Sequence, residues 1–117
     1  FPMGLSAVAE RATIGGILST NAGGLNAVRY GTARALALGV EADLASGEMV
    51  SDMTAVRKKN QGLDVTQLFV GSEGTLGLIT GACLALAPAP ASLATAALWC
   101  ETPGDAVEAY RRMRGES

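Results

Sequence analysis

Apolar and polar residues alternate along residues 35–45 of the chain. A period of two residues is that of a β-strand with one buried face. Ser46 and Gly47 then supply a turn, so residues 48–51 are predicted to return as a paired strand. The pattern therefore predicts a β-hairpin, whose inward positions are Leu36, Leu38, Val40, Ala42 and Leu44.

Two later segments carry a strand signal as well. Residues 78–87 are predicted to form a second long strand, in which Leu84 and Leu86 alternate with small residues. Residues 93–101 also look like a strand, and they follow a proline-rich stretch at 88–90. Because proline does not join the interior of a sheet ladder, that stretch marks a boundary or a linker. The pattern predicts one unit up to the prolines and a separate segment after them.

Helix signals appear at three places. Short helices are expected around Ile14 and around Thr66, the latter capped by Asp64. A longer helix is expected to begin after Thr102, which is followed by a proline, and to stop at Gly115. Strands and helices together predict an α+β fold with a mainly antiparallel sheet and flanking short helices.

Composition narrows the possible chemistry. The 117 residues contain no histidine, which removes serine–histidine and cysteine–histidine nucleophiles and most zinc sites. The net charge of -2 and an aromatic content of 4% argue against a nucleic-acid partner. No apolar run reaches the roughly 18 residues that span a bilayer, and no signal peptide is recognisable. We therefore expect no metal site, no nucleic acid, no membrane span and a cytoplasmic location.

Two segments carry unusual amounts of glycine. Residues 12–24 read "ATIGGILSTNAGG", and residues 71–77 read "GSEGTLG". A glycine inside a helix costs roughly 1 kcal/mol against alanine, but bare backbone N–H groups can approach an anion or a ring closely. Neither a dinucleotide fingerprint nor a P-loop occurs. Spacing alone slightly favours the plainer interpretation, tight turns that lead into a helix and a strand.

With the blocks between them, these segments resemble a known family. "ATIGG", "TNAGG", "RYGTAR", "LASGEMV" and "LFVGSEGTLGLIT" follow one another as in the flavin-binding domain of FAD-linked oxidases of the D-lactate, glycolate and D-2-hydroxyglutarate dehydrogenase type. The resemblance implies that residues 1–88 are the second subdomain of a two-part FAD-binding domain. It also implies that residues 89–117 are a linker and the first strand and helix of a truncated substrate domain.

The resemblance implies FAD as the cofactor of the complete protein, held largely through backbone contacts. It assigns no catalytic residue and no metal ligand to this chain; Glu73 is expected to bond the loop or the cofactor, and Glu41 to be solvated. Ile17 and Leu63 depart from the pattern, where asparagine and tyrosine are common. The implied cofactor-binding residues are Thr13, Ile14, Gly15, Gly16, Ser19, Thr20, Asn21, Gly23, Gly24, Glu73, Gly74, Gly77, Leu78 and Ile79.

As to function, the resemblance implies a fragment of an FAD-dependent oxidoreductase that oxidises a small 2-hydroxy acid. The alternatives are a fragment of a non-redox enzyme similar to the ether-lipid synthases, and a non-catalytic structural module. Alone, the chain is expected to be inactive and to bind FAD weakly, because half of the pocket wall is elsewhere. An exposed apolar face suggests self-association. The sequence leaves the particular acid and the electron acceptor open.

Overall fold

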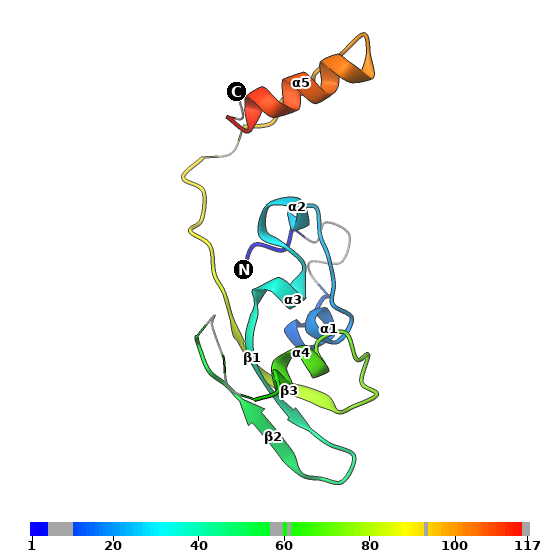
Figure 1. The fold of residues 1–117 in the computed structure, drawn as a ribbon, viewed down its shortest axis with the longest axis vertical. Helices are drawn as coiled ribbons and strands as arrows, with labels where there is room; N and C mark the ends of the chain where they lie inside the picture. Colours follow the sequence, from blue (N-terminus) through cyan, green and yellow to red (C-terminus); the bar gives the residue numbers. More distant parts are fainter. Residues whose placement is uncertain (5–10, 57–59, 61, 93, 116–117) are drawn as a thin grey trace.

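Short helices and antiparallel strands alternate along the part of the chain that the computed structural model describes, residues 1–4, 11–56, 60, 62–92 and 94–115. Figure 1 shows most of these elements gathered in one body, with the last helix set apart at the end of an extended segment. The predicted α+β arrangement is confirmed. In chain order the elements are α1 (Ile14–Ser19), α2 (Ala27–Tyr30), α3 (Ala33–Leu36), β1 (Ala37–Asp43), β2 (Met49–Asp52), α4 (Val65–Phe69), β3 (Leu78–Leu84) and α5 (Pro103–Met113).

The sheet of the described residues has three strands in the order β2, β1, β3. The hairpin of β1 and β2 is antiparallel, and its register begins with Val40 opposite Asp52. β3 pairs with the other edge of β1, also antiparallel. The predicted hairpin and the strand predicted at 78–87 are therefore confirmed, and the second of these ends at Leu84.

The strict alternation predicted for residues 35–45 holds only in the second half of β1. The residues just before Ala37 form α3, and the pairing of β1 with β3 is irregular between Ala37 and Gly39. Ala37 and Gly39 are both buried as a result, while Leu38 is only half-buried. An irregularity of this kind changes which face a residue occupies, so a period of two in the sequence could not show it.

The core lies between the sheet and the short helices. α1 packs against β3 and α4 against β1, and Figure 1 shows both helices to one side of the strands. Leu18, Val40 and Val70 are the largest fully buried apolar side chains. The smaller or less deeply buried members of the same cluster are Met3, Ile17, Ala33, Leu36, Ala37, Ala42, Phe69 and Ala85.

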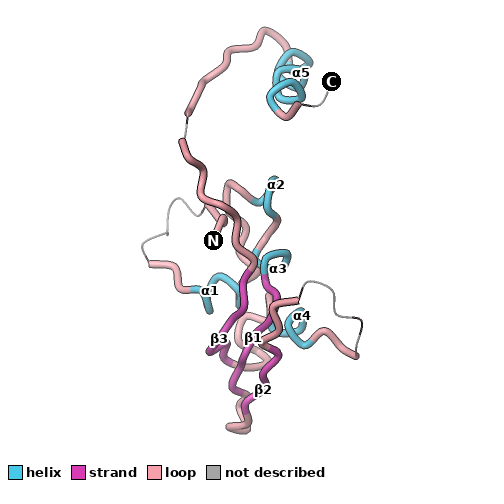
Figure 2. Tube along the Cα trace, turned by 90° about the vertical axis from the view of Figure 1, so that its left-hand side faces the viewer, coloured by secondary structure: helices cyan, strands magenta, loops and turns pink. Residues whose placement is uncertain are grey.

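The segment between β3 and α5 differs from the prediction. Its described residues 94–100 form no strand, and Figure 2 draws the described part of the connection as loop. Trp99 is 95% exposed and Leu98 is 61% exposed, so neither packs against a neighbouring strand. A lone strand leaves its backbone groups without partners in a sheet. The strand predicted at 93–101 is therefore wrong for the described residues, and Leu93 lies outside them.

Helix α5 begins where the sequence predicts. Thr102 Oγ1 accepts a hydrogen bond from Asp105 N at 3.2 Å, and an Asp105 carboxylate oxygen accepts one from Thr102 N at 3.1 Å. This reciprocal pair is a capping box. The helix ends at Met113, two residues before Gly115, and buries none of its residues. Local signals, rather than packing, account for this helix.

Candidate cofactor site

The two glycine-bearing segments lie against each other. Gly71 N donates to Leu18 O at 3.0 Å, and Glu73 N donates to Ser19 O at 2.9 Å. Both carbonyls belong to the last turn of α1, whose carbonyls have no partner within the helix; Leu18 O also accepts from Asn21 N at 3.0 Å in the turn that follows. The loop of residues 71–77 thus caps the end of α1, and segments about fifty residues apart in the sequence meet at one edge of the body.

Threonine hydroxyls close both ends of α1. Thr13 Oγ1 accepts a hydrogen bond from Gly16 N at 3.1 Å, and Thr20 Oγ1 donates to Gly16 O at 2.9 Å. A hydroxyl has a single proton to donate. Among the described contacts, the Thr20 hydroxyl already donates its proton to Gly16 O, whereas the Thr13 hydroxyl only accepts a hydrogen bond. Of the two predicted residues, Thr13 is therefore the one that can still donate to an acceptor outside the chain.

Close internal packing favours glycine at two positions of the first segment. A Cβ at Gly15 would lie 3.2 Å from the carbonyl oxygen of Ile79, so glycine lets α1 approach β3 closely. Gly24 lies elsewhere, against the N-terminal residues, where a Cβ would overlap the carbonyl oxygen of Met3. Leu25 N fixes this contact by donating to Gly4 O at 3.1 Å. Internal packing thus gives a reason for glycine at both positions that is independent of any ligand.

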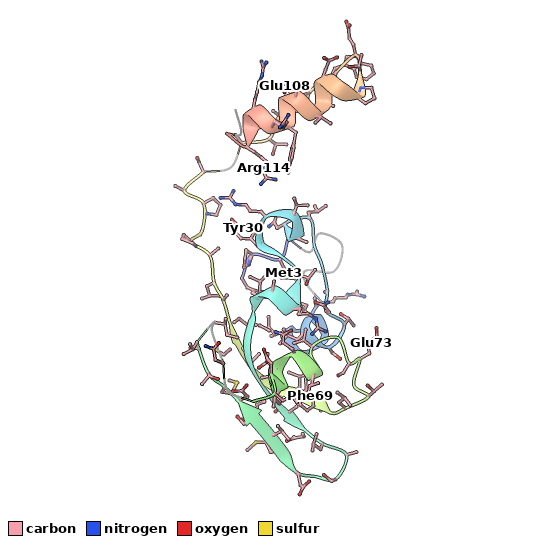
Figure 3. The ribbon with its side chains drawn as sticks, viewed as in Figure 1. Met3, Tyr30, Phe69, Glu73, Glu108 and Arg114 are labelled. Atoms are coloured by element: carbon pink, nitrogen blue, oxygen red, sulfur yellow. The ribbon has the colours of Figure 1, made fainter. Side chains whose placement is uncertain are left out.

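The opposite is found at Gly74 in the loop of residues 71–77. Gly74 adopts φ +81°, and a Cβ there would meet nothing within 4 Å. Its neighbour Glu73 lies at the margin of the body in Figure 3. Ile14 and Leu78, from the adjoining α1 and β3, are 42% and 70% exposed. The surface around the loop is therefore open and partly apolar, which fits one side of a flat ligand.

Two residues of the site carry strained backbone. Asn21 and Glu73 have φ values of +49° and +51° and are the non-glycine residues with positive φ in the described part of the chain. This conformation costs roughly 1–2 kcal/mol for an L-residue, and such residues cluster at functional sites. Asn21 also adjoins the loop, because a Cβ at Gly71 would lie 3.3 Å from Asn21 Cβ.

Sequence analysis missed the side chain that joins these parts. The Arg34 guanidinium donates to Gln67 O at 2.7 Å, to Gln67 Oε1 at 3.0 Å and to Val70 O. Arg34 N donates to the side chain of Asn21 at 3.0 Å. The partners of the guanidinium lie 33 and 36 residues further along the chain. The block "RYGTAR" contains this arginine, but nothing in the sequence indicates what it contacts.

The carboxylates that the structure describes are not grouped as metal ligands. Glu41, expected to be solvated, is half-buried, and its Oε1 accepts a hydrogen bond from Thr80 Oγ1 at 3.1 Å across β1 and β3. No three His, Cys, Asp or Glu residues of the described chain are grouped so that they could hold a metal ion. Within the same residues, no helix has the length and apolar character needed to cross a bilayer.

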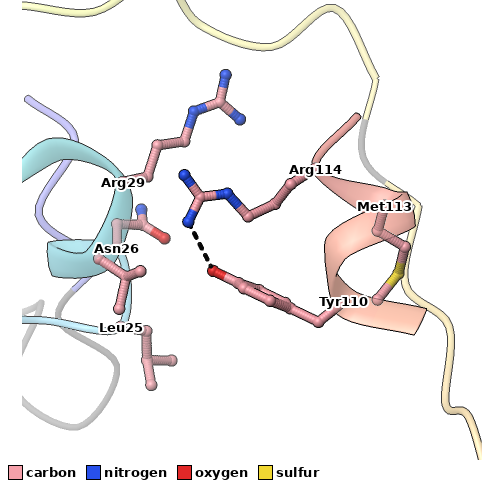
Figure 4. A pocket seen from close by; sticks show the side chains of 7 residues that line it. Leu25, Asn26, Arg29, Tyr110, Met113 and Arg114 are labelled. Atoms are coloured by element: carbon pink, nitrogen blue, oxygen red, sulfur yellow. Dashed lines mark hydrogen bonds between the residues drawn. The ribbon is translucent and has the colours of Figure 1, made fainter. Parts of the chain in front are cut away.

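A cavity of about 590 Å³ lies apart from the predicted residues, between α2 and α5. Figure 4 shows Arg29 on one side of it and Arg114 on the other, with Arg114 donating to the Tyr110 hydroxyl at 3.3 Å. Leu25 and Val28 on its wall are 80% and 81% exposed. These exposures describe an open gap between two segments, and none of its lining residues belongs to the predicted site.

Comparison with known proteins identifies the first part of this arrangement. Residues 3–52 match the family described as the FAD binding domain. This segment belongs to that family. It contains α1, the hairpin and the whole of the first glycine-bearing segment, while the loop of residues 71–77 lies beyond the match.

Similar curated proteins extend the match along the chain. D-2-hydroxyglutarate dehydrogenase of Bos taurus is 44% identical over 101 residues, 86% of this chain and 19% of that protein. D-2-hydroxyglutarate–pyruvate transhydrogenase of Saccharomyces cerevisiae is 45% identical over 93 residues, 80% and 18%. D-lactate dehydrogenase of Archaeoglobus fulgidus is 41% identical over 109 residues, 90% and 25%. The chain thus spans a quarter or less of each of these relatives.

A solved structure shows the same fold. An alkyldihydroxyacetonephosphate synthase matches 89% of this chain and 18% of its own, with a TM-score of 0.63 and 24% identity. At that identity the likeness concerns the fold alone. The α+β body with its antiparallel sheet therefore corresponds to part of a larger known architecture.

Proposed function

We propose that the chain forms one wall of an FAD site within an oxidoreductase that oxidises a small 2-hydroxy acid. The observation that carries the proposal is the pair of hydrogen bonds from Gly71 and Glu73 to the end of α1, because they bring both glycine-bearing segments to one surface. Support for the redox chemistry comes from relatives named as D-2-hydroxyglutarate and D-lactate dehydrogenases.

The proposed wall uses backbone and apolar contacts, with few polar side chains. Bound FAD would supply a ring that accepts a hydride from the carbon bearing the substrate hydroxyl. Ile14 and Leu78 offer exposed apolar area to a flat ring, and the Thr13 hydroxyl can donate to a phosphate oxygen. Gly74 leaves the surface free of a side chain. The full proposed set remains Thr13, Ile14, Gly15, Gly16, Ser19, Thr20, Asn21, Gly23, Gly24, Glu73, Gly74, Gly77, Leu78 and Ile79.

The proposal assigns different roles to two parts of the chain. Residues 1–88 are taken as the second part of an FAD-binding domain, and residues 89–117 as a linker that leads toward a substrate domain. Helix α5 supports this division, because it buries none of its residues against the body. The open wall also supports the expectation that the chain alone binds FAD weakly. The cytoplasmic location stays a prediction. The Bos taurus relative, in contrast, is named as mitochondrial.

Two matched glycine variants test the wall. Gly74 and Gly47 have φ values of +81° and +84°, and a Cβ at either would meet nothing within 4 Å. Gly74→Ala and Gly47→Ala therefore introduce the same backbone strain, but only Gly74 lies in the proposed wall. We expect Gly74→Ala to weaken FAD binding about tenfold, or about 1.4 kcal/mol, and Gly47→Ala to leave the Kd unchanged. The Kd is measured by flavin fluorescence titration. Equal effects of the two variants on the Kd would refute the claim that Gly74 lies in the FAD-binding surface.

A second measurement tests the reaction. In the natural protein that carries this chain, loaded with FAD under anaerobic conditions, D-2-hydroxyglutarate or D-lactate should bleach the visible flavin absorption band. Flavin that binds but is bleached by neither acid would remove the oxidoreductase part of the proposal and leave the FAD wall. That outcome would favour a non-redox enzyme, an alternative that the shared fold with the synthase keeps open.

A further inference from the structure

We infer that Arg34 is a positioning residue, which holds the loop of residues 71–77 in place against the end of α1. The inference rests on the proposed function only for its effect on FAD. Its structural part concerns the chain itself and can be tested without the cofactor.

Arg34 acts at the C-terminal end of α4. This helix has five residues, Val65–Phe69, which is too short to be stable from its own hydrogen bonds. The guanidinium donates to Gln67 O and Val70 O, two carbonyls at the helix end, and to Gln67 Oε1. Gln67 Nε2 donates back to Arg34 O at 3.4 Å. The planar fork of arginine can satisfy several acceptors at once, so a single side chain fixes where α4 ends. These hydrogen bonds between Arg34, Gln67 and Val70 are called the clamp below.

The clamped helix end is continuous with the loop. Val70 is followed directly by Gly71, whose N–H bonds Leu18 O. A Cβ at Gly71 would lie 3.0 Å from Arg34 Nη2, so the guanidinium and the start of the loop are in close contact. Movement of the Val70 carbonyl would carry the Gly71 amide with it. The clamp therefore controls the first of the two hydrogen bonds that join the loop to α1.

The backbone of Arg34 is anchored to the first glycine-bearing segment. Arg34 N donates to Asn21 Oδ1 at 3.0 Å, and the neighbouring Ala33 N donates to Ala22 O at 2.9 Å. One residue is thereby bonded to the turn after α1, through its backbone, and to the end of α4, through its side chain. The strained residues Asn21 and Glu73 lie at the two ends of this connection.

The acceptors of the Arg34 guanidinium allow the effect of its planar shape to be tested separately from the effect of its charge. Among the described residues, the acceptors of the Arg34 side chain are neutral oxygens, two of backbone carbonyls and one of a side-chain amide. Arg34→Lys keeps the positive charge but has no planar fork, so it can retain only part of the clamp. Arg34→Met removes every donor and keeps much of the apolar stem. Arg111→Met is the matched control, because Arg111 is exposed in the last turn of α5.

The experiment measures amide hydrogen exchange in the chain by NMR, together with FAD titration. Arg34→Met should accelerate exchange at Gly71 and Glu73 at least tenfold while the amides of β1 keep their rates. Arg34→Lys should fall between the wild type and Arg34→Met, and Arg111→Met should match the wild type. FAD should bind about tenfold more weakly to Arg34→Met. If Arg34→Met does not fold, Gln67→Met removes the side-chain half of the clamp and should accelerate the same two amides.

The outcomes separate this inference from the proposed function. Selective acceleration at Gly71 and Glu73 in a chain that shows no FAD binding would support the clamp and count against the flavin wall. Unchanged exchange at these amides would overturn the clamp, whatever happens to FAD. Equal acceleration of the loop and of β1 would also overturn it, because Arg34 would then support the whole fold rather than position the loop.

Discussion

The candidate site and helix α5 are held in opposite ways. The site depends on contacts between residues far apart in the chain, such as Gly71 with Leu18 and Arg34 with Gln67. Helix α5 has its cap within four residues, Thr102 to Asp105. Capping residues next to α5 thus account for a helix that buries none of its residues. The candidate site, in contrast, forms only when the folded body brings distant segments together.

Burial shows the same difference. Leu18 and Val40 in the body are 0% and 1% exposed, while Val107 and Met113 on α5 are 58% and 67% exposed. Burying an aliphatic side chain contributes roughly 1.5–3 kcal/mol. Substitutions in the body should therefore change the free energy of unfolding, and substitutions in α5 should change only that helix.

The largest effect is expected for Leu18→Ala. Leu18 is fully buried between α1 and the sheet, and its carbonyl also accepts from Gly71. A cavity at such a position lowers the free energy of unfolding by about 3 kcal/mol, which urea denaturation measures. Val107→Ala, the control on α5, should change it by less than about 0.5 kcal/mol. Similar losses for both variants would mean that α5 packs as tightly as the body.

A neighbouring pair of glycines gives the next effect. In Gly24→Ala the new methyl group would overlap Met3 O, so the backbone must move; Gly23→Ala would make an ordinary contact, 3.5 Å from the Thr32 methyl carbon. We expect a loss of about 2 kcal/mol for Gly24→Ala and little change for Gly23→Ala. Thermal unfolding of the two variants decides this. Equal stability would show that the N-terminal residues do not pack on Gly24.

The smallest effect is expected for Thr102→Ala. Loss of the capping box should cost about 1 kcal/mol within α5, because Asp105 N loses its acceptor. The carbon chemical shifts of α5 should then move toward coil values, while the urea midpoint of the body stays the same. Ser92→Ala, in the extended connection, serves as the control. A shifted urea midpoint in Thr102→Ala would contradict the independence of α5.

These contrasts explain what the sequence could and could not predict. The period of two located the hairpin and β3, and the sequence Thr102-Pro103 located α5, because each signal lies within its own element. The prediction of a strand at 93–101 was wrong for the described residues, because this segment has no partner strand among them. The irregular pairing near Gly39 and the contacts of Arg34 depend on residues brought close only by folding. The close approach of Gly15 to Ile79 and of Gly24 to Met3 could not be predicted either, because these neighbours are far away in the sequence or give no local signal.

The central claim is that both glycine-bearing segments face one ligand, and NMR titration of the chain with FAD tests it most directly. We expect chemical shift changes at amides of residues 13–24 and 71–79, and none in α5 or in the hairpin turn at Gly47. The changes should saturate only at high FAD concentration, because the affinity is weak. Changes confined to one of the two segments, or centred on the gap between α2 and α5, would contradict a shared wall. Tight stoichiometric binding would contradict the claim that this chain supplies only one side of the site.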